Sequence, residues 1–355
     1  MNLSQFEGQL GRKSPLARGT GRGLTARAMG GAPWLLIAGL LYAGLFIKPE
    51  AAGSAVVPPS IERRDLLLGV AVQDNTVWLA GNFGKILRSD DGKGEHWTVQ
   101  VTGTEEHLQD IDAWDKDHAV AVGNGGTILV TTDGGGTWQP IVVELSEVAN
   151  KLMRVKTGPD QGEAWAVGEM GAILHSTDFG RHWALMRPAE DVIMSDIEVS
   201  NPDDLLVVGE YGRMFHSRDH GRSWVARQSP SAASLTAIRF RDRLHGVAVG
   251  LDGALLWTAD GGGTWNAVPP SRSGNVQHLF GVSWDPARGE WLAVGAKGVW
   301  VAAAADMDRF ATGRLSALDL AAHTEIAGMG GGRWVIAGAS PGSWDGKNWQ
   351  TLIGK

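Results

Sequence analysis

The stretch Ala119–Trp138, AVAVGNGGTILVTTDGGGTW, decides the fold because versions of it recur along most of the chain. It begins with a small-apolar run ending in glycine and passes a second glycine into an apolar segment. It ends with Thr-x-Asp, a glycine-rich turn and tryptophan. Clear copies follow at Ala164–Trp183, Leu205–Trp224 and Gly246–Trp265. Self-similarity at a fixed period indicates a repeat architecture in which each unit packs on its neighbours.

Three weaker copies bring the repeat to seven. Val77–Trp97 carries one extra turn residue, Trp291–Phe310 lacks the Ser/Thr and ends in phenylalanine, and Trp334–Trp349 is shortened. The leading glycines, from Gly81 to Gly338, recur about every 43 residues, the length of a four-stranded propeller blade. One more apolar segment precedes each copy, which makes four strands per unit.

We therefore expect an all-β domain over residues 66–355, a seven-bladed β-propeller of four-stranded antiparallel blades. A blade cannot bury both of its faces alone, so the blades must stack into a ring, which also removes exposed sheet faces. The last predicted strand ends close to the C-terminus. Closure by the first blade packing on the seventh, helped by residues 56–68, is one possibility that the sequence leaves open.

The repeated aspartate and tryptophan positions are predicted to be structural. An aspartate in such a turn accepts hydrogen bonds from the backbone amides of its own turn, and the indole packs on the sheet. A catalytic carboxylate has no reason to appear six times at one repeat position. The residues concerned are Asp91, Trp97, Asp133, Trp138, Asp178, Trp183, Asp219, Trp224, Asp260, Trp265, Asp345 and Trp349.

These turns are the Asp-box (BNR) repeats that sialidases and related propellers share. With the preceding LxDI segment, the consensus VGxxGxILxTxDGGxTW resembles the photosystem II assembly and stability factor family, and Leu108–Trp138 carries the fullest match. The resemblance implies a seven-bladed propeller that acts as an assembly chaperone for a membrane complex, without enzymatic activity. Non-photosynthetic bacterial relatives often accompany exporters of the resistance-nodulation-division class. The chain departs from the cyanobacterial pattern because it has no lipobox cysteine.

Charge separates the N-terminus from the rest of the chain. Residues 1–50 contain six Lys/Arg and two Glu, whereas the remainder contains 26 basic and 37 acidic residues, a net charge of −11. An acidic body argues against nucleic-acid binding, which needs a broadly basic surface. Residues 1–30 are predicted to be a disordered basic tail and residues 49–65 a linker.

Residues 31–48 are predicted to be one N-terminal transmembrane helix. Twenty uncharged residues separate Arg27 from Lys48, enough for a helix of roughly 30 Å. Five positive charges precede the segment and one follows, so the positive-inside rule places the propeller on the periplasmic side of the inner membrane. A cleaved signal peptide is the alternative, because Gly53–Ala55 has the small residues that signal peptidases accept.

A sialidase-like glycoside hydrolase is the main enzymatic alternative, and a propeller that binds a glycan or small ligand is another. Sialidases use a tyrosine nucleophile with an arginine trio. Tyr42 lies in the predicted membrane segment, which leaves Tyr211, in a loop beside Glu210. No Arg-Ile-Pro signature or arginine trio accompanies it. We therefore expect a non-catalytic scaffold with no cofactor.

No metal site is expected either. His175 and His216 occupy the same strand position in adjacent repeats, so they reflect repetition, and His220 lies in the turn that follows His216. No histidine spacing matches a zinc site. The absence of cysteine excludes disulfides and thiolate ligands.

Two charged patches are the candidate partner-binding surfaces. Antiparallel alternation places the loops between second and third strands on the same face as the connections between blades. The acidic face would carry Glu169, Glu210, Tyr211 and Asp252, and the opposite face Arg218, Arg222, Arg241 and Arg243. With the predicted anchor, the family resemblance implies a membrane-anchored scaffold for a membrane protein complex, with an exporter as the expected partner. The sequence identifies neither the partner nor the oligomeric state.

Overall fold

The computed structural model describes residues 34–42, 44, 58–146 and 149–354. The chain divides into two compact units, Met1–Val57 and Pro58–Lys355. Residues 34–42 and 44 of the first unit are helical. Within the described residues, no helix has the length and apolarity that crossing a membrane requires. The predicted tail and much of the predicted membrane segment and linker lie outside the described residues, so these assignments remain predictions.

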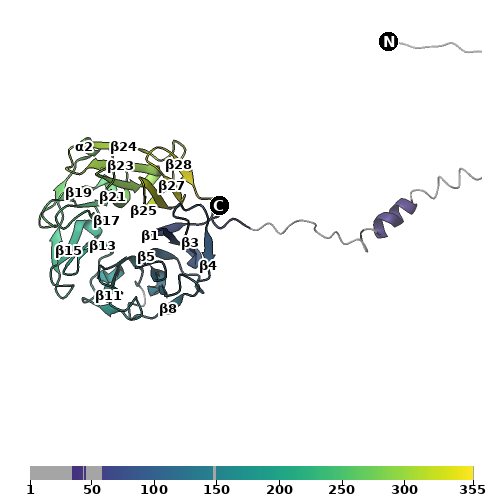
Figure 1. Cartoon of the computed structure of the whole chain (residues 1–355), viewed down its shortest axis with the longest axis horizontal. Coiled ribbons are helices and arrows are strands. Elements are labelled where there is room, and N and C mark those ends of the chain that lie inside the picture. Colours follow the sequence, from purple (N-terminus) through teal and green to yellow (C-terminus); the bar gives the residue numbers. More distant parts are fainter. Residues whose placement is uncertain (1–33, 43, 45–57, 147–148, 355) are drawn as a thin grey trace, which may run out of the picture. The chain divides into compact units, whose positions relative to one another are not determined.

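The second unit is an all-β propeller whose sheets are arranged around a centre (Figure 1). Each four-stranded group begins with an inner strand. The inner strands are β1 (Leu67–Gln73), β5 (Leu108–Ala113), β9 (Leu152–Thr157), β13 (Met194–Asn201), β17 (Leu235–Phe240), β21 (Leu279–Asp285) and β25 (His323–Gly330). Each contacts the next in this order, and β25 contacts β1, so the ring is closed.

The second strand of each group ends in the leading glycine of the repeat. These strands are β2 (Thr76–Gly81), β6 (Ala119–Gly123), β10 (Ala164–Gly168), β14 (Asp204–Gly209), β18 (Gly246–Gly250), β22 (Glu290–Gly295) and β26 (Arg333–Gly338). They are the most buried strands because each is covered by sheets on both sides. Their continuous small-apolar sequences follow from that burial.

The third and fourth strands complete each group outward. The third strands are β3 (Ile86–Ser89), β7 (Ile128–Thr131), β11 (Ile173–Ser176), β15 (Arg213–Ser217), β19 (Leu255–Thr258), β23 (Val299–Ala304) and β27 (Gly342–Trp344). The fourth are β4 (Thr98–Gln100), β8 (Gln139–Ile141), β12 (Ala184–Leu185), β16 (Val225–Gln228), β20 (Asn266–Ala267), β24 (Phe310–Arg314) and β28 (Trp349–Thr351). A short helix, α2 (Pro270–Ser273), follows β20.

In the described part of the chain, these strands form five four-stranded antiparallel sheets and one eight-stranded sheet. The eight-stranded sheet contains β1–β4 and β25–β28, which are joined through the residue pair Leu67 and Gly338. The residues before β1 also help to close the ring. Ile61 is fully buried with Leu352, and the Gly354 amide donates to the Ile61 carbonyl at 2.8 Å.

The core lies between neighbouring sheets rather than within one layer. Trp78 of β2 packs edge-on against Trp138, whose ring centroid lies 5.8 Å away, in a cluster that joins β1–β3 to β5–β7. Equivalent clusters occur between successive sheets around the ring. Because every sheet depends on its neighbours, the inner strands are held rigidly around a narrow channel.

Candidate functional site

The second residue of each of the seven inner strands lies at one end of the central channel. These residues, together with Arg154, surround a cavity of about 160 Å³. They are Leu68, Gln109, Met153, Ser195, Thr236, Phe280 and Thr324. Typical ligand pockets are about twofold or more larger, so this cavity suits one side chain better than a saccharide.

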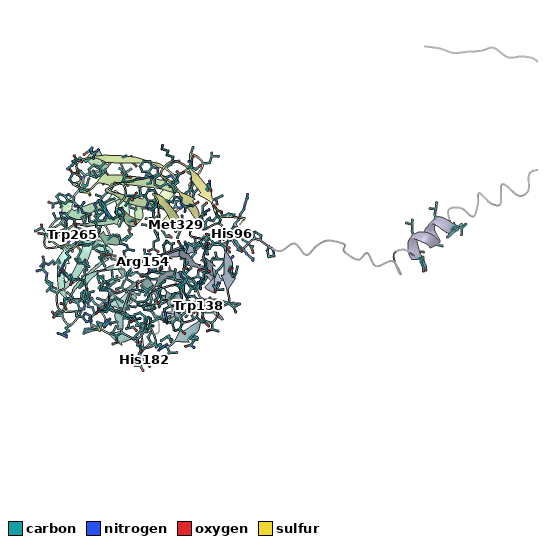
Figure 2. The ribbon with its side chains drawn as sticks, viewed as in Figure 1. His96, Trp138, Arg154, His182, Trp265 and Met329 are labelled. Carbon is teal, nitrogen blue, oxygen red and sulfur yellow. The ribbon has the colours of Figure 1, made fainter. Side chains whose placement is uncertain are left out.

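Charged side chains occupy the next inner-strand position. Asp110, Asp196 and Glu325 surround Arg154, and all four are buried. A terminal nitrogen of Arg154 lies 3.0 Å from Glu325 Oε2 and 3.5 Å from Asp110 Oδ1, and its Nε lies 3.5 Å from Asp196 Oδ1. Figure 2 shows Arg154 near the centre of the ring. These three acidic side chains already surround the arginine, so it is not free to bind an anionic ligand.

A second charged layer follows along the channel. Lys156 Nζ lies 3.3 Å from Glu325 Oε1, and a terminal nitrogen of Arg239 lies 3.1 Å from Asp196 Oδ2. Burial, together with the charge of Glu325, raises the pKa of Asp110 well above its ordinary value. Burial would also raise the pKa of Glu325, but Arg154, Lys156 and Arg239 outweigh it and lower that pKa to about 2. These surroundings therefore favour the ionised form of Glu325 over the ionised form of Asp110.

The channel carboxylates also connect neighbouring blades. Each accepts a hydrogen bond from a backbone amide of the next inner strand, which would otherwise lack a partner in the channel wall. The three bonds each measure 2.9 Å and join Asp110 to Val155, Asp196 to Ile238 and Glu325 to Val70. Sequence reasoning quoted the LxDI segment but did not identify its aspartate as a channel residue. The available signal was an acidic residue at the third position of three inner strands, namely Asp110, Asp196 and Glu325.

This geometry does not match glycoside hydrolysis. Catalytic carboxylates of glycosidases stand several ångströms apart with the sugar between them, whereas Asp110 and Glu325 are both buried against Arg154. The predicted alternative nucleophile, Tyr211, is 69% exposed in the loop between β14 and β15.

The predicted Asp-box residues lie in peripheral turns and do not converge on the channel. Asp133 Oδ1 accepts from the Thr137 amide at 2.9 Å and from the Thr131 hydroxyl at 2.9 Å. The same serine or threonine hydroxyl accepts from a glycine amide inside the turn, as Thr258 does from Gly262 at 3.0 Å. Comparable turn bonds are made by Asp91, Asp178, Asp219, Asp260 and Asp345. The indoles of Trp97, Trp138, Trp183, Trp224, Trp265 and Trp349 contact the hydrophobic clusters.

The loops between second and third strands meet the blade connections at one end of the ring, here called the mouth face. For example, the Gly84 amide donates to the Glu106 carbonyl at 2.8 Å. The middle residue of each of these loops is left-handed, with φ between 54° and 64°, a conformation that bulky side chains rarely adopt. The loops are η1 (Asn82–Gly84), η2 (Asn124–Gly126), η3 (Glu169–Gly171), η4 (Glu210–Gly212), η5 (Leu251–Gly253) and η6 (Ala296–Gly298), with middle residues Phe83, Gly125, Met170, Tyr211, Asp252 and Lys297.

Exposed apolar side chains are concentrated on this mouth face. Outside the strands of the described ring, the large exposed apolar residue on the opposite face is Leu244. Those on the mouth face are Phe83, Val101, Val142, Tyr211, Val276, Leu318 and Leu320. Single exposed apolar residues are ordinary, and these come from loops of several blades, so the mouth face as a whole is a candidate contact surface.

The predicted acidic patch is partly engaged within the fold. Glu169 and Glu210 each accept from a backbone amide of the adjoining blade connection, at 3.0 Å from Lys151 and 3.0 Å from Ile193. These two carboxylates therefore stabilise loops and present less free charge than the sequence suggested. The side chain of Asp252 remains exposed.

The predicted basic patch is also divided. Arg241 lies over the Trp284 ring, 4.9 Å from its centroid, and donates to the Ala305 carbonyl at 3.2 Å. Its guanidinium is therefore already engaged. The exposed members are Arg218, Arg222 and Arg243.

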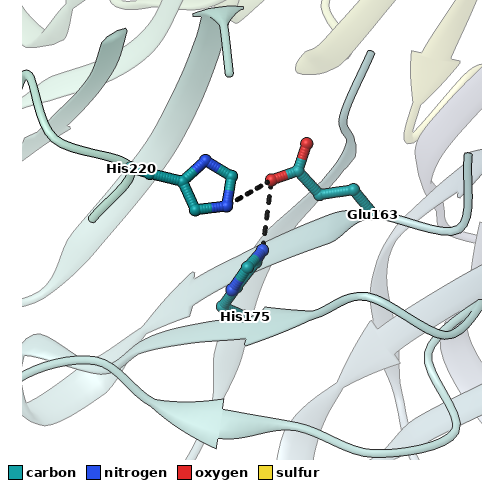
Figure 3. Close-up of side chains that lie close together, drawn as sticks. All are labelled: Glu163, His175 and His220. Carbon is teal, nitrogen blue, oxygen red and sulfur yellow. Dashed lines mark hydrogen bonds and ion pairs between the residues drawn. The ribbon is translucent and has the colours of Figure 1, made fainter. Parts of the chain in front are cut away.

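The structure also brings together three residues that sequence reasoning kept apart. Glu163, His175 and His220 place one ligand atom each within 4.8 Å of one another (Figure 3). This arrangement differs from the sequence expectation that His175 only marks repetition. The histidines come from neighbouring blades, so their spacing along the chain carried no signal.

Comparisons with known proteins agree with the repeat. A family model described as photosynthesis system II assembly factor YCF48 matches residues 92–191. The photosystem II assembly lipoprotein Ycf48 of Synechococcus sp. (strain CC9902) is 30% identical over 96 residues. That match spans 26% of this chain and 28% of the relative's length.

Solved structures support the fold more widely. YCF48 bound to a D1 peptide has a TM-score of 0.63 at 16% identity, over 79% of this chain and 92% of that chain. A GH74 enzyme of Niastella koreensis has a TM-score of 0.64 at 13% identity, over 81% of this chain and 53% of that one. Identities this low show a shared propeller fold and do not transfer an activity.

Proposed function

We propose that this chain, which is a Ycf48-like β-propeller, is a non-catalytic assembly or accessory factor for a membrane protein complex. The resemblance to an assembly factor and to a propeller bound to a peptide supports this role. The burial of the channel carboxylates around Arg154 supports the absence of catalysis, because a substrate has no access to them.

The observation that carries the proposal is the placement of Phe83 and Tyr211. Both occupy left-handed loop positions, with φ of 55°, where glycine or asparagine is less strained. Their side chains are 64% and 69% exposed, so most of each ring is uncovered by the fold. The Phe83 ring meets the His107 ring edge-on at a centroid distance of 5.3 Å but stays largely exposed, and strained, exposed aromatic positions favour a role in contact with a partner. We infer that the mouth face docks an extramembrane segment of the partner.

Three further parts of the proposal concern the number of blades, the membrane anchor and the partner. We count seven blades, treating β1–β4 and β25–β28 as two blades joined by one residue pair. The chain contains no cysteine for a lipid anchor, so we assign anchoring to residues 31–48 and place the propeller on the periplasmic side. An exporter of the resistance-nodulation-division class is the partner that we favour.

Site-specific photocrosslinking tests this function. A photoreactive residue replaces Tyr211 on the mouth face, and in a matched variant Arg218 on the opposite face, of the full chain in its native membranes. We expect Tyr211 to crosslink to one integral membrane protein, and Arg218 to give no such product. Crosslinking to that protein from Arg218 alone would place the docking surface on the basic face. No crosslink from either position would refute the proposal.

A further inference from the structure

In each of two adjacent blades, a histidine of the third strand lies beside a carboxylate at the start of the second strand of that blade. His175 Nε2 lies 3.1 Å from Glu163 Oε1, and His216 Nε2 lies 2.5 Å from Asp204 Oδ1. Strand register makes the two pairs equivalent, because Trp165 is opposite His175 and Leu206 is opposite His216. The protein therefore contains two versions of one arrangement.

A third ligand reaches the first pair from the neighbouring blade. His220 follows the Asp-box aspartate Asp219, and its Nε2 lies 3.4 Å from Glu163 Oε1 (Figure 3). The corresponding residue in the next blade is Gly261, which follows Asp260 and has no side chain to offer. Among the described residues, Glu163, His175 and His220 form a cluster with metal-ligand geometry, whereas the His216 pair does not belong to one.

Two of the three separations among the ligand atoms suit a tetrahedral ion, and the third, between the two histidine nitrogens, is at most 4.8 Å. Bonds of about 2.0–2.1 Å to zinc place neighbouring tetrahedral ligands about 3.3 Å apart. The two measured separations from Glu163 Oε1, 3.1 and 3.4 Å, lie on either side of that value. The imidazole nitrogens and the carboxylate oxygen are a donor set that zinc and its transition-metal neighbours accept.

A backbone carbonyl orients the ring of His220. His220 Nδ1 lies 2.6 Å from the Pro202 carbonyl, and Nε2 faces the Glu163 carboxylate. An outer hydrogen bond of this kind orients metal-bound histidines.

The Glu163 carboxylate has one oxygen that is not engaged in a hydrogen bond. Its side chain is 2% exposed, and Oε2 has no hydrogen-bond partner, although Oε1 accepts from Trp165 Nε1 at 3.0 Å. The Trp165 ring stacks on His175 at a centroid distance of 3.9 Å and fixes its orientation. His220 is partly exposed, which gives an ion access from the surface.

We propose that Glu163, His175 and His220 form a transition-metal site of the zinc class that joins two neighbouring blades. Water completes the coordination on the exposed side of His220. The site lies away from the exposed apolar loops of the mouth face, and its occupancy adds a link between the sheet of β9–β12 and the sheet of β13–β16.

Calorimetric titration with ZnCl₂ tests the site in the full chain, purified without a histidine tag and treated with a chelator. We expect one saturable site per chain. His220→Gly should weaken zinc affinity at least tenfold, since one of three protein ligands is lost. His182→Ala is the matched control, because His182 is exposed and pairs with Asp178 in another Asp-box turn; its affinity should equal that of the wild type.

Glycine suits the left-handed φ of 58° at position 220, so the variant should fold normally, which circular dichroism without metal would check. A Co²⁺-loaded wild type should show the intense visible absorption of tetrahedral coordination. Absence of saturable zinc binding by the wild type would overturn the proposal. Equal affinity in wild type and His220→Gly, or an octahedral Co²⁺ spectrum, would do the same.

Discussion

Glu325 accepts a hydrogen bond of 2.9 Å from the backbone amide of Val70, 255 positions earlier in the chain. The bond joins the last inner strand, β25, to the first, β1, at the point where the ring closes. The same carboxylate neutralises Arg154, so ring closure and channel charge depend on one side chain.

Replacing Glu325 by alanine should therefore destabilise the propeller strongly. The change removes a negative charge from beside the cations Arg154 and Lys156 in the channel. Losing one partner of a buried charge pair costs about 3–5 kcal/mol. Urea unfolding measures the change in free energy. Glu95→Ala, at an exposed site, is the control and should cost less than about 0.5 kcal/mol. Equal costs for the two variants would contradict the role assigned to Glu325.

The Asp-box turn predicts a difference between two threonines of one motif. Thr258 is buried and accepts from the Gly262 amide, whereas Thr264 is exposed and bonds only to Asp260 through its side chain. Thr258→Val keeps the shape but leaves a buried amide unpaired, at a cost of about 1–3 kcal/mol. Thr264→Val should cost less than about 0.5 kcal/mol. Thermal and urea unfolding of both variants would measure the contrast, and a larger loss for Thr264→Val would refute it.

Two glutamates should shift the pH dependence of stability in opposite directions. Burial raises the pKa of Glu198 in the folded state to about 7. The stabilisation that comes from protonated Glu198 is therefore complete below the unfolded pKa of about 4.3 and is lost as pH rises toward 7. Hydrogen bonding to Arg187 lowers the pKa of Glu190, so its contribution is present above about pH 4.3 and is lost as pH falls through the folded pKa.

Glu198→Gln should accordingly gain stability relative to the wild type between pH 4 and pH 8. Glu190→Gln should be less stable than the wild type at neutral pH and approach it in acid. Urea unfolding across that range gives both curves. Parallel curves for the wild type and Glu198→Gln would show that Glu198 ionises normally in the fold.

Replacing Phe83 and Tyr211 by asparagine should leave the fold intact. Asparagine tolerates the left-handed conformation better, so the free energy of unfolding should stay unchanged or rise by up to about 1 kcal/mol per site. Asp252→Asn, at the equivalent position of another blade, is the control and should change nothing. Thermal unfolding measures all three, and a marked loss of stability would show that the two aromatic rings serve the fold.

Much of the fold follows from local sequence. The glycine of each leading run, the Asp-box turn and the returning tryptophan repeat in register, so strand order and the structural positions of Asp133 and Trp138 could be anticipated. Contacts between blades could not be predicted from local sequence. Asp110 accepts a hydrogen bond from Val155, and Glu163 lies close to His220, although the residues of each pair are far apart along the chain.

The predicted patches show why formal charge on a loop is a poor guide to a binding surface. Glu169 and Glu210 were placed on the correct loops, yet backbone amides engage their carboxylates. Arg241 was read as a free cation, but Trp284 and Ala305 engage it. The proposed docking surface instead rests on exposed apolar residues at left-handed positions, such as Phe83, which only the backbone conformation reveals.

Quantitative co-purification from membranes tests docking through the mouth face most directly. The full chain is compared with Phe83→Asn/Tyr211→Asn and with the opposite-face charge reversal Arg218→Glu/Arg222→Glu. Recovery of the crosslinked membrane protein should fall at least tenfold with the asparagine pair and stay near the wild-type level with the charge reversal. Undiminished recovery with the asparagine pair, or loss confined to the charge reversal, would contradict docking through this face.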